Sequence, residues 1–125
     1  MAELLDSIEA SEVITIATVT STGRVIPTAV GAVVVGDAGY VRSQKGAKGK
    51  WYRRAIVAPN GFVLDGAVRY PVTFQPVADA DTIRRVDEAT HRKYGGVLRS
   101  LLLRPLLCRT RAFVVKITPV GGAVS

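Results

Sequence analysis

Alternation between apolar and polar positions marks most of this chain as short strands. Residues 12–20 are β-branched almost throughout, and residues 25–35 form a long apolar run in which Gly31 marks a bend or bulge. Asp65-Gly66 stands between two alternating arms, which is a strong hairpin signal. The predicted strands are 12–20, 25–35, 40–43, 62–64, 67–77 and 111–118.

Helical periodicity is confined to three segments. Residues 3–10 and 51–57 predict short helices, and the clearest helix is 79–94, which has Asp79 and Asp81 in its first turn and Gly95-Gly96 at its end. Its apolar face consists of Ile83, Val86, Thr90 and Tyr94. Short turns join most strands and there is no βαβ alternation. The pattern therefore predicts a mainly β fold, a small six-stranded antiparallel barrel with inserted helices.

Length and charge narrow the class of protein further. The 125 residues fit a single domain spanning 1–125. The formal net charge is +7, and this favours an anionic partner such as a phosphorylated cofactor, nucleic acid or a membrane surface. The N-terminal segment lacks the features of a signal peptide, and no run approaches the ~20 apolar residues of a membrane span. We therefore expect a soluble, cytoplasmic protein without a membrane partner.

Residues 40–54 carry the strongest functional signal. The segment holds the only Trp of the chain and no acidic residue. Lys45, Lys48 and Lys50 crowd the predicted start of a helix, where the macrodipole already presents positive charge and acids are expected instead. Lysines and glycines at a helix start indicate a socket for an anion, with Trp51-Tyr52 covering the flat part of the ligand. The alternative is a solvated basic turn with Trp51 in the core.

Four short blocks of sequence occur in this order along the chain: Tyr40-Val41-Arg42-Ser43, Trp51-Tyr52-Arg53-Arg54, Val72-Thr73-Phe74 and Lys93-Tyr94-Gly95. With these blocks, nearly the whole chain resembles the split-barrel flavin-binding superfamily related to pyridoxamine-phosphate oxidase. More closely, it resembles a small uncharacterised family in that group near the deazaflavin-dependent nitroreductases. Those relatives carry Ser-Lys-Gly-Gly where this chain has Ser43-Gln44-Lys45-Gly46. Their basic Gly-rich hairpin is reduced here to Thr22-Gly23-Arg24, with Pro27-Thr28 after it.

The resemblance implies a homodimer of six-stranded split barrels with two ligand sites at the subunit interface. The cofactor would be FMN or the deazaflavin coenzyme, and hydride would pass from its ring to a small electron-poor organic substrate. Tyr52 and Tyr94 are the candidate catalytic residues, as proton donors. The implied cofactor-binding residues are Thr28, Arg42, Ser43, Lys45, Gly46, Ala47, Lys48, Lys50, Trp51 and Tyr52.

Other functions of the same scaffold stay open, and so does the question of whether the protein is an enzyme at all. One alternative is a cofactor-free small-molecule-binding protein, or an isomerase or cyclase. A nucleic-acid-binding small barrel is disfavoured, because the lysines gather at one turn where a distributed basic stripe would be expected.

The remaining chemically active side chains point to structural roles. One His and one Cys give no metal site, His91 is expected at the surface, and Cys108 in the core or an interface. The carboxylates of the third helix are expected to cap and solvate it; they are Asp79, Asp81, Asp87 and Glu88. The Leu- and Arg-rich segment 97–109 allows three roles, ranked as a dimer-interface element, a lid over the ligand and a membrane contact.

Overall fold

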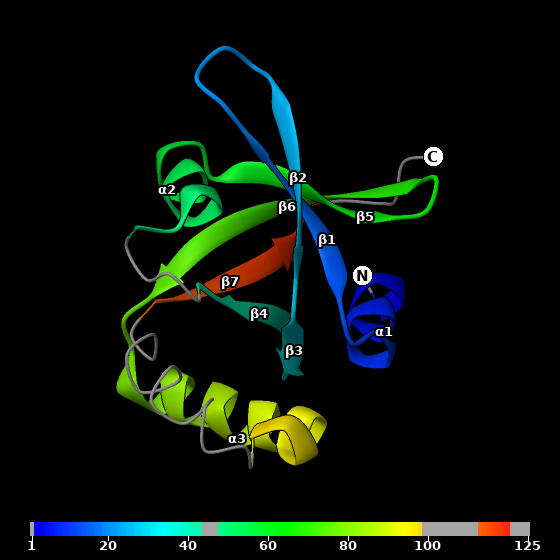
Figure 1. Cartoon of the computed structure of the whole chain (residues 1–125), viewed down its shortest axis with the longest axis vertical. Coiled ribbons are helices and arrows are strands. Elements are labelled where there is room, and N and C mark those ends of the chain that lie inside the picture. Colours follow the sequence, from blue (N-terminus) through cyan, green and yellow to red (C-terminus); the bar gives the residue numbers. More distant parts are fainter. Residues whose placement is uncertain (1, 44–47, 99–112, 121–125) are drawn as a thin grey trace.

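The computed structural model describes residues 2–43, 48–98 and 113–120. Within these ranges three helices pack around one strongly curved, seven-stranded sheet (Figure 1). The helices are α1 (Ala2–Ala10), α2 (Lys50–Val57) and α3 (Ala80–Leu98). The strands are β1 (Ile14–Val19), β2 (Val25–Val30), β3 (Ala32–Val35), β4 (Ala38–Arg42), β5 (Asn60–Asp65), β6 (Val68–Val77) and β7 (Val114–Pro119).

The sheet confirms the predicted mainly β, antiparallel barrel but has one more strand than the six expected. Its order is β2-β1-β5-β6-β7-β4-β3, and every neighbouring pair is antiparallel. The extra strand arises because the apolar run 25–35 is divided at Gly31, where the sequence predicts a bend. One half pairs with β1 at one edge of the sheet, and the other pairs with β4 at the opposite edge. The sheet therefore curls until its two edge strands are consecutive in the chain.

Local sequence explains the hairpin between β5 and β6. Asp65 pairs with Val68, which leaves Gly66 and Ala67 as a two-residue loop. Gly66 has a φ of +61°, a left-handed conformation that glycine adopts without steric cost. In the second arm Val72 and Phe74 are buried, whereas Thr73 between them is half-buried and Gln75 is exposed, in line with the predicted alternation.

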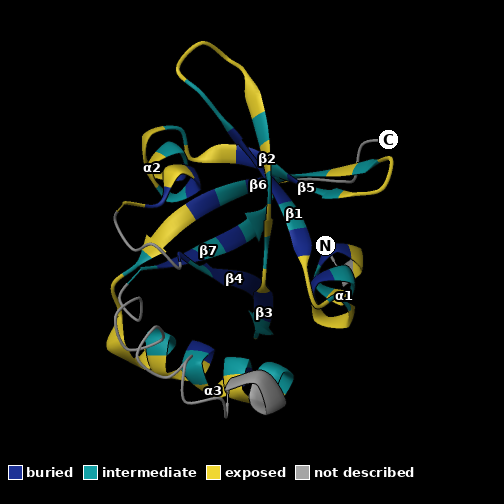
Figure 2. Ribbon diagram, in the orientation of Figure 1, coloured by how far each residue is buried: buried dark blue, intermediate teal, exposed yellow. Residues whose placement is uncertain are grey.

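Two apolar clusters form the core, and Figure 2 shows the buried positions concentrated in the sheet and on the inner faces of the helices. The first cluster fills the barrel, where Leu4 and Ile8 of α1 and Trp51 and Ala55 of α2 pack against the sheet. The second lies between α3 and the sheet. Its buried members are Val33, Ala38, Tyr40, Val86, Ala89 and Val114. The predicted apolar face of the third helix is thereby confirmed for Val86, with Ile83 and Tyr94 packed beside it.

The third helix ends later than its sequence predicts. It continues to Leu98, and the expected stop at Gly95-Gly96 is only a kink, with non-helical dihedral angles at Tyr94 (φ −116°, ψ 22°). A glycine pair lowers helix propensity but does not forbid a further turn. None of the helices in the described ranges is long and apolar enough to span a membrane.

Candidate functional site

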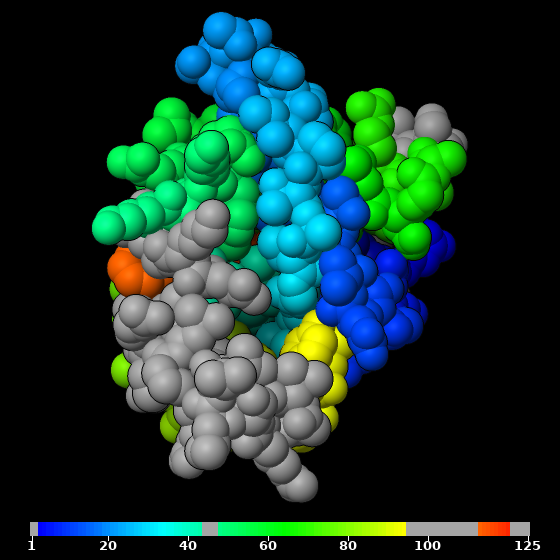
Figure 3. All heavy atoms as spheres, in the orientation of Figure 1, coloured from blue at the N-terminus to red at the C-terminus, as the bar shows by residue number. Residues whose placement is uncertain are grey.

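The start of α2 presents an uncompensated basic surface. The helix begins at Lys50 after Gly49, which has no side chain to cap it, and no acid lies in the first turn. Lys48 and Lys50 are exposed, whereas Trp51 and Ala55 are buried where the helix packs on β1 and β6. Figure 3 shows this helix directly beside the β1–β2 hairpin on one face of the molecule. The predicted basic helix start is therefore present.

The two aromatic residues of α2 differ in burial. Trp51 is only 9% exposed and belongs to the barrel core, as the alternative interpretation of this segment expects. Tyr52 is half-buried, and its ring packs edge-on against Trp51 at 6.1 Å and against Phe113 at 5.6 Å between centroids. Of the two rings, Tyr52 is thus the more accessible to a ligand, and Trp51 fixes the position of the helix that carries it.

Arg42 and Ser43 lie at the end of β4. The guanidinium of Arg42 forms an ion pair with Asp87 of α3, and the Arg42 side chain is 11% exposed. Ser43 is fully buried, and its backbone N–H donates to the carbonyl of Phe113 at 2.9 Å. The sequence predicts that Asp87 caps or solvates its helix. The structure shows a different role, because Asp87 connects α3 to the sheet through Arg42. The predicted ligand residues Lys45, Gly46 and Ala47 lie outside the described residues.

Sequence reasoning missed Arg54, which lies between α2 and the sheet. Its Nε donates to Oγ1 of Thr18 on β1 at 2.7 Å, and Thr18 is completely buried. Thr18 pairs with Ile26, and Ile16 pairs with Thr28. Directly paired residues of antiparallel strands point to the same face, so Thr28 lies on the face of the sheet that Thr18 presents to α2. The signal that could have indicated Arg54 is its place one helical turn after Lys50.

The second predicted catalytic residue, Tyr94, lies elsewhere. Its hydroxyl donates to the carbonyl of Glu12 at 2.7 Å and lies 3.3 Å from that of Ala32. Burial, with the carboxylates of Glu12 and Glu9 nearby, raises the pKa of Tyr94 above its ordinary value. Tyr52 packs with the barrel core and Tyr94 with the α3 cluster, on helices that are well separated in Figure 1. The structure does not bring these two residues together.

Lys93, beside Tyr94, also donates to backbone carbonyls of distant segments. Its ammonium donates to the carbonyls of Ile8 at 2.6 Å and Ala32 at 2.7 Å. Burial lowers the pKa of Lys93, and Glu9 opposes this shift. Lys93 and Tyr94 together connect the end of α3 to α1, to the α1–β1 connection and to β3. We refer to these two residues as the α3 clamp.

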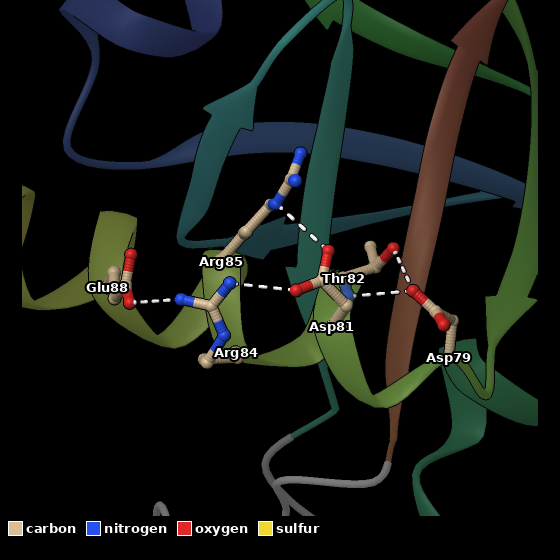
Figure 4. A network of polar contacts seen from close by, with 6 residues as sticks. All are labelled: Asp79, Asp81, Thr82, Arg84, Arg85 and Glu88. Atoms are coloured by element: carbon tan, nitrogen blue, oxygen red, sulfur yellow. Dashed lines mark hydrogen bonds and ion pairs between the residues drawn. The ribbon is translucent and has the colours of Figure 1, made fainter.

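The acidic residues at the start of α3 form a self-contained network (Figure 4). Asp79 caps the helix, accepting from the backbone N–H of Thr82 at 2.8 Å and from its hydroxyl at 2.6 Å; these bonds lower the pKa of Asp79. Arg84 bridges Asp81 and Glu88, each at 2.7 Å. The predicted capping and solvating roles are confirmed for these three carboxylates, which are thereby occupied within their own helix.

No group of three potential His, Cys, Asp or Glu ligands for a metal ion occurs in the part of the chain that the structure describes. His91 is exposed, as expected. Cys108 and most of segment 97–109 lie outside the described residues.

Known structures define the class of this fold. The chain is similar to HutZ, the heme storage protein of Vibrio cholerae, with a TM-score of 0.73, 14% identity, and coverage of 98% of this chain and 92% of HutZ. It is also similar to a proposed 5-nitroimidazole antibiotic resistance protein of Bacteroides thetaiotaomicron (TM-score 0.69, 13% identity, 98% and 82% coverage). A third similar structure is a proposed pyridoxamine 5′-phosphate oxidase of Listeria innocua, with a TM-score of 0.68, 15% identity, and coverage of 96% of this chain and 93% of the other. The fold is therefore that of the split-barrel proteins related to pyridoxamine-phosphate oxidase.

Within this class, the chain belongs to the family described as uncharacterized protein conserved in bacteria (DUF2255), whose model matches residues 4–117. None of the curated proteins matches it in sequence. At such low identities the structural neighbours establish the fold alone, so the ligand has to be inferred from the residues of the site.

Proposed function

We propose that this protein binds a flavin-type coenzyme, FMN or a phosphorylated deazaflavin, and that it is an oxidoreductase acting on a small electron-poor organic substrate. The observation that carries the proposal is the basic start of α2 without any counter-charge. All ten acidic side chains of the chain belong to the described residues, and none of them pairs with Lys48 or Lys50.

Cations at a helix N-terminus cost about 0.3–1 kcal/mol each, because they face the positive end of the macrodipole. A bound phosphate reverses this effect, since it accepts hydrogen bonds from the free N–H groups and pairs with the lysines. The residues present therefore fit a phosphorylated coenzyme. In this proposal Lys48 and Lys50 bind the phosphate together with Lys45, Gly46 and Ala47.

Arg42, Ser43 and Thr28 complete the coenzyme site in this proposal. Arg42 retains donors beyond the one that pairs with Asp87, because a guanidinium carries five N–H groups. Ser43 holds the end of β4 through its bond to Phe113, and Thr28 offers a hydroxyl from the β2 side.

When bound, the reduced coenzyme would supply hydride, one proton with two electrons, and would be reduced again by an external reductase. The protein would bind the ring beside Tyr52, with Trp51 behind it in the core. A proton for the substrate would come from a tyrosine hydroxyl. Tyr52 is favoured over Tyr94 for this role, because the Tyr94 hydroxyl already donates to a backbone carbonyl of another segment.

A second subunit is the proposed cover for the outer face of β2. Val25, Pro27 and Ala29 are exposed on that face, Val25 to 47%, while Ile26, Thr28 and Val30 between them are half-buried. An edge strand with apolar side chains facing solvent is a surface that proteins usually cover. We propose a homodimer that uses this strand, so that two coenzyme sites lie near the shared surface.

Titration of the purified full-length chain tests the coenzyme proposal. FMN, the deazaflavin coenzyme and hemin are each followed by absorbance or fluorescence, and micromolar affinity for one of the first two is expected. Lys48→Glu combined with Lys50→Glu should weaken that affinity at least about a hundredfold, because two charge-assisted bonds are lost.

The control carries the same change in net charge at two exposed positions away from α2, Arg69→Glu on β6 with Arg92→Glu on α3. This variant should bind normally if the effect belongs to the site. Equal affinity of wild type and the lysine variant would contradict the assignment. Binding of hemin alone would replace it with a heme function. Binding of none of the three would favour the cofactor-free alternative. Salt-dependent binding of single-stranded nucleic acid would favour a nucleic-acid-binding small barrel.

A further inference from the structure

Arg54 lies where a positive charge is costly unless something neutralises it. The side chain is half-buried, and no acidic side chain of the chain pairs with it. Its partner within the protein is neutral, the hydroxyl of Thr18, which accepts from Nε at 2.7 Å. A half-buried guanidinium with only a neutral acceptor has lost hydration without gaining a counter-charge.

The neighbours of Arg54 add positive charge instead of relieving it. Lys50 precedes it by four residues in α2, so the two side chains lie on the same face of the helix, where like charges repel. Long side chains of a helix point back toward its N-terminus, which brings the guanidinium of Arg54 toward Lys50. An anion bound between or beside the two cations would relieve this repulsion.

The sheet offers a third donor, the hydroxyl of Thr28, on the face that carries Thr18. Thr28 and Thr18 are diagonal neighbours on one face of β1 and β2, and such neighbours lie about 7–8 Å apart. Thr18 is fully buried and holds Nε, so the terminal nitrogens of Arg54 are oriented by a rigid part of the sheet. Guanidinium, ammonium and hydroxyl together offer several donors from two elements, which suits the three terminal oxygens of a phosphate.

We propose that Arg54, oriented by Thr18 and assisted by Lys50 and Thr28, binds a phosphate group of the ligand on the β1–β2 side of α2. The inference rests on the proposed function in that Lys50 belongs to both sites, and it adds a binding residue that the resemblance did not assign. Thr18 acts as a positioning residue, since its hydroxyl holds the guanidinium without itself reaching the surface.

Inorganic phosphate is the probe, so that the test does not require any flavin. The melting temperature of the full-length chain is measured in phosphate and in chloride at equal ionic strength, because a ligand that binds the native state raises it. Arg54→Met keeps the apolar stem but should weaken phosphate binding at least about tenfold and remove most of the increment. Arg54→Lys keeps the charge and should retain part of the increase in melting temperature. Thr18→Val leaves the charge unchanged and should reduce the increase.

The matched control is Arg53→Met, which removes the same charge from the neighbouring, exposed residue of the same helix and should leave the increment unchanged. Equal losses in the Arg53 and Arg54 variants, or no increment in wild type, would overturn the inference. If phosphate binding depends on Arg54 but neither coenzyme binds, the subsite stands and the flavin proposal fails. If a coenzyme binds with equal affinity to wild type and Arg54→Met, the flavin proposal stands and the Arg54 subsite fails.

Discussion

At the scale of single residues, Gly61 shows how tightly the barrel is packed. A Cβ at this position would lie 2.4 Å from the carbonyl oxygen of Ala17 and 2.4 Å from the ring of Phe74. The backbone of β5 approaches β1 this closely because no side chain intervenes on that face. Neither the carbonyl of a paired strand nor a buried aromatic ring can move without disturbing the core.

We therefore expect Gly61→Ala to destabilise the protein by about 1–3 kcal/mol or more through overpacking. Gly39→Ala is the matched control, since its Cβ would meet the flexible end of Ile8 at 2.8 Å and its next neighbours at 3.8 Å or more. Urea denaturation of both variants tests the comparison. A smaller loss for Gly61→Ala than for Gly39→Ala would mean that β5 and β1 are further apart than described.

At the scale of elements, the α3 clamp attaches a helix to segments more than sixty residues away. The hydroxyl of Tyr94 lies over the bend at Gly31, where an added Cβ would be 3.4 Å from it. Lys93 donates to the Ile8 carbonyl in the last turn of α1, which also accepts from the backbone N–H of Ser11 at 3.4 Å. Two polar side chains thus donate to carbonyls of α1, of the α1–β1 connection and of β3.

The raised pKa of Tyr94 gives the clamp a pH dependence of definite sign. Below its ordinary value of 10.0 the phenol is protonated in both the folded and the unfolded chain, so its contribution is complete. Above that value the unfolded chain releases the proton first, and the contribution declines as pH rises through the folded pKa. We expect Tyr94→Phe to cost about 1 kcal/mol at pH 8 and less above pH 10. Urea denaturation of both proteins at both pH values measures this difference, and a gap that widens with pH would contradict it.

Local rules predicted the elements but not the contacts between them. The Asp65-Gly66 turn and the bend at Gly31 follow from backbone preferences of a few residues, and both are present. The ion pair of Arg42 with Asp87 joins residues 45 positions apart and is not visible in any local pattern. For the same reason no local pattern distinguishes Arg54, because its partner Thr18 lies 36 positions away on another element.

At the scale of the whole molecule, the outer face of β2 determines the expected assembly. Substitution of the exposed Ala29 by Glu would place a charge in the middle of the proposed subunit contact. We expect wild type to be a dimer and Ala29→Glu a monomer by light scattering coupled to size exclusion, because an unpaired charge in an interface core is strongly unfavourable.

Ser21→Glu, at an exposed position of the β1–β2 turn, introduces the same charge outside the strand and should remain dimeric. Coincident far-UV circular dichroism spectra of the two variants would exclude misfolding as the cause of dissociation. A monomeric wild type, or a dimeric Ala29→Glu variant, would mean that this strand is not the contact between subunits.

The place of β7 in the sheet has a consequence for how the protein is made. This strand, the last of those described, lies between β6 and β4 and so joins the four strands β2-β1-β5-β6 to the pair β4-β3. A growing chain that has not yet released residues 114–119 from the ribosome holds two incomplete sheets, each with an unpaired edge. Such edges template association between chains. Nascent copies of this protein are therefore exposed to aggregation until residues 114–119 have emerged, which makes the arrival of β7 the step that chaperones would have to protect.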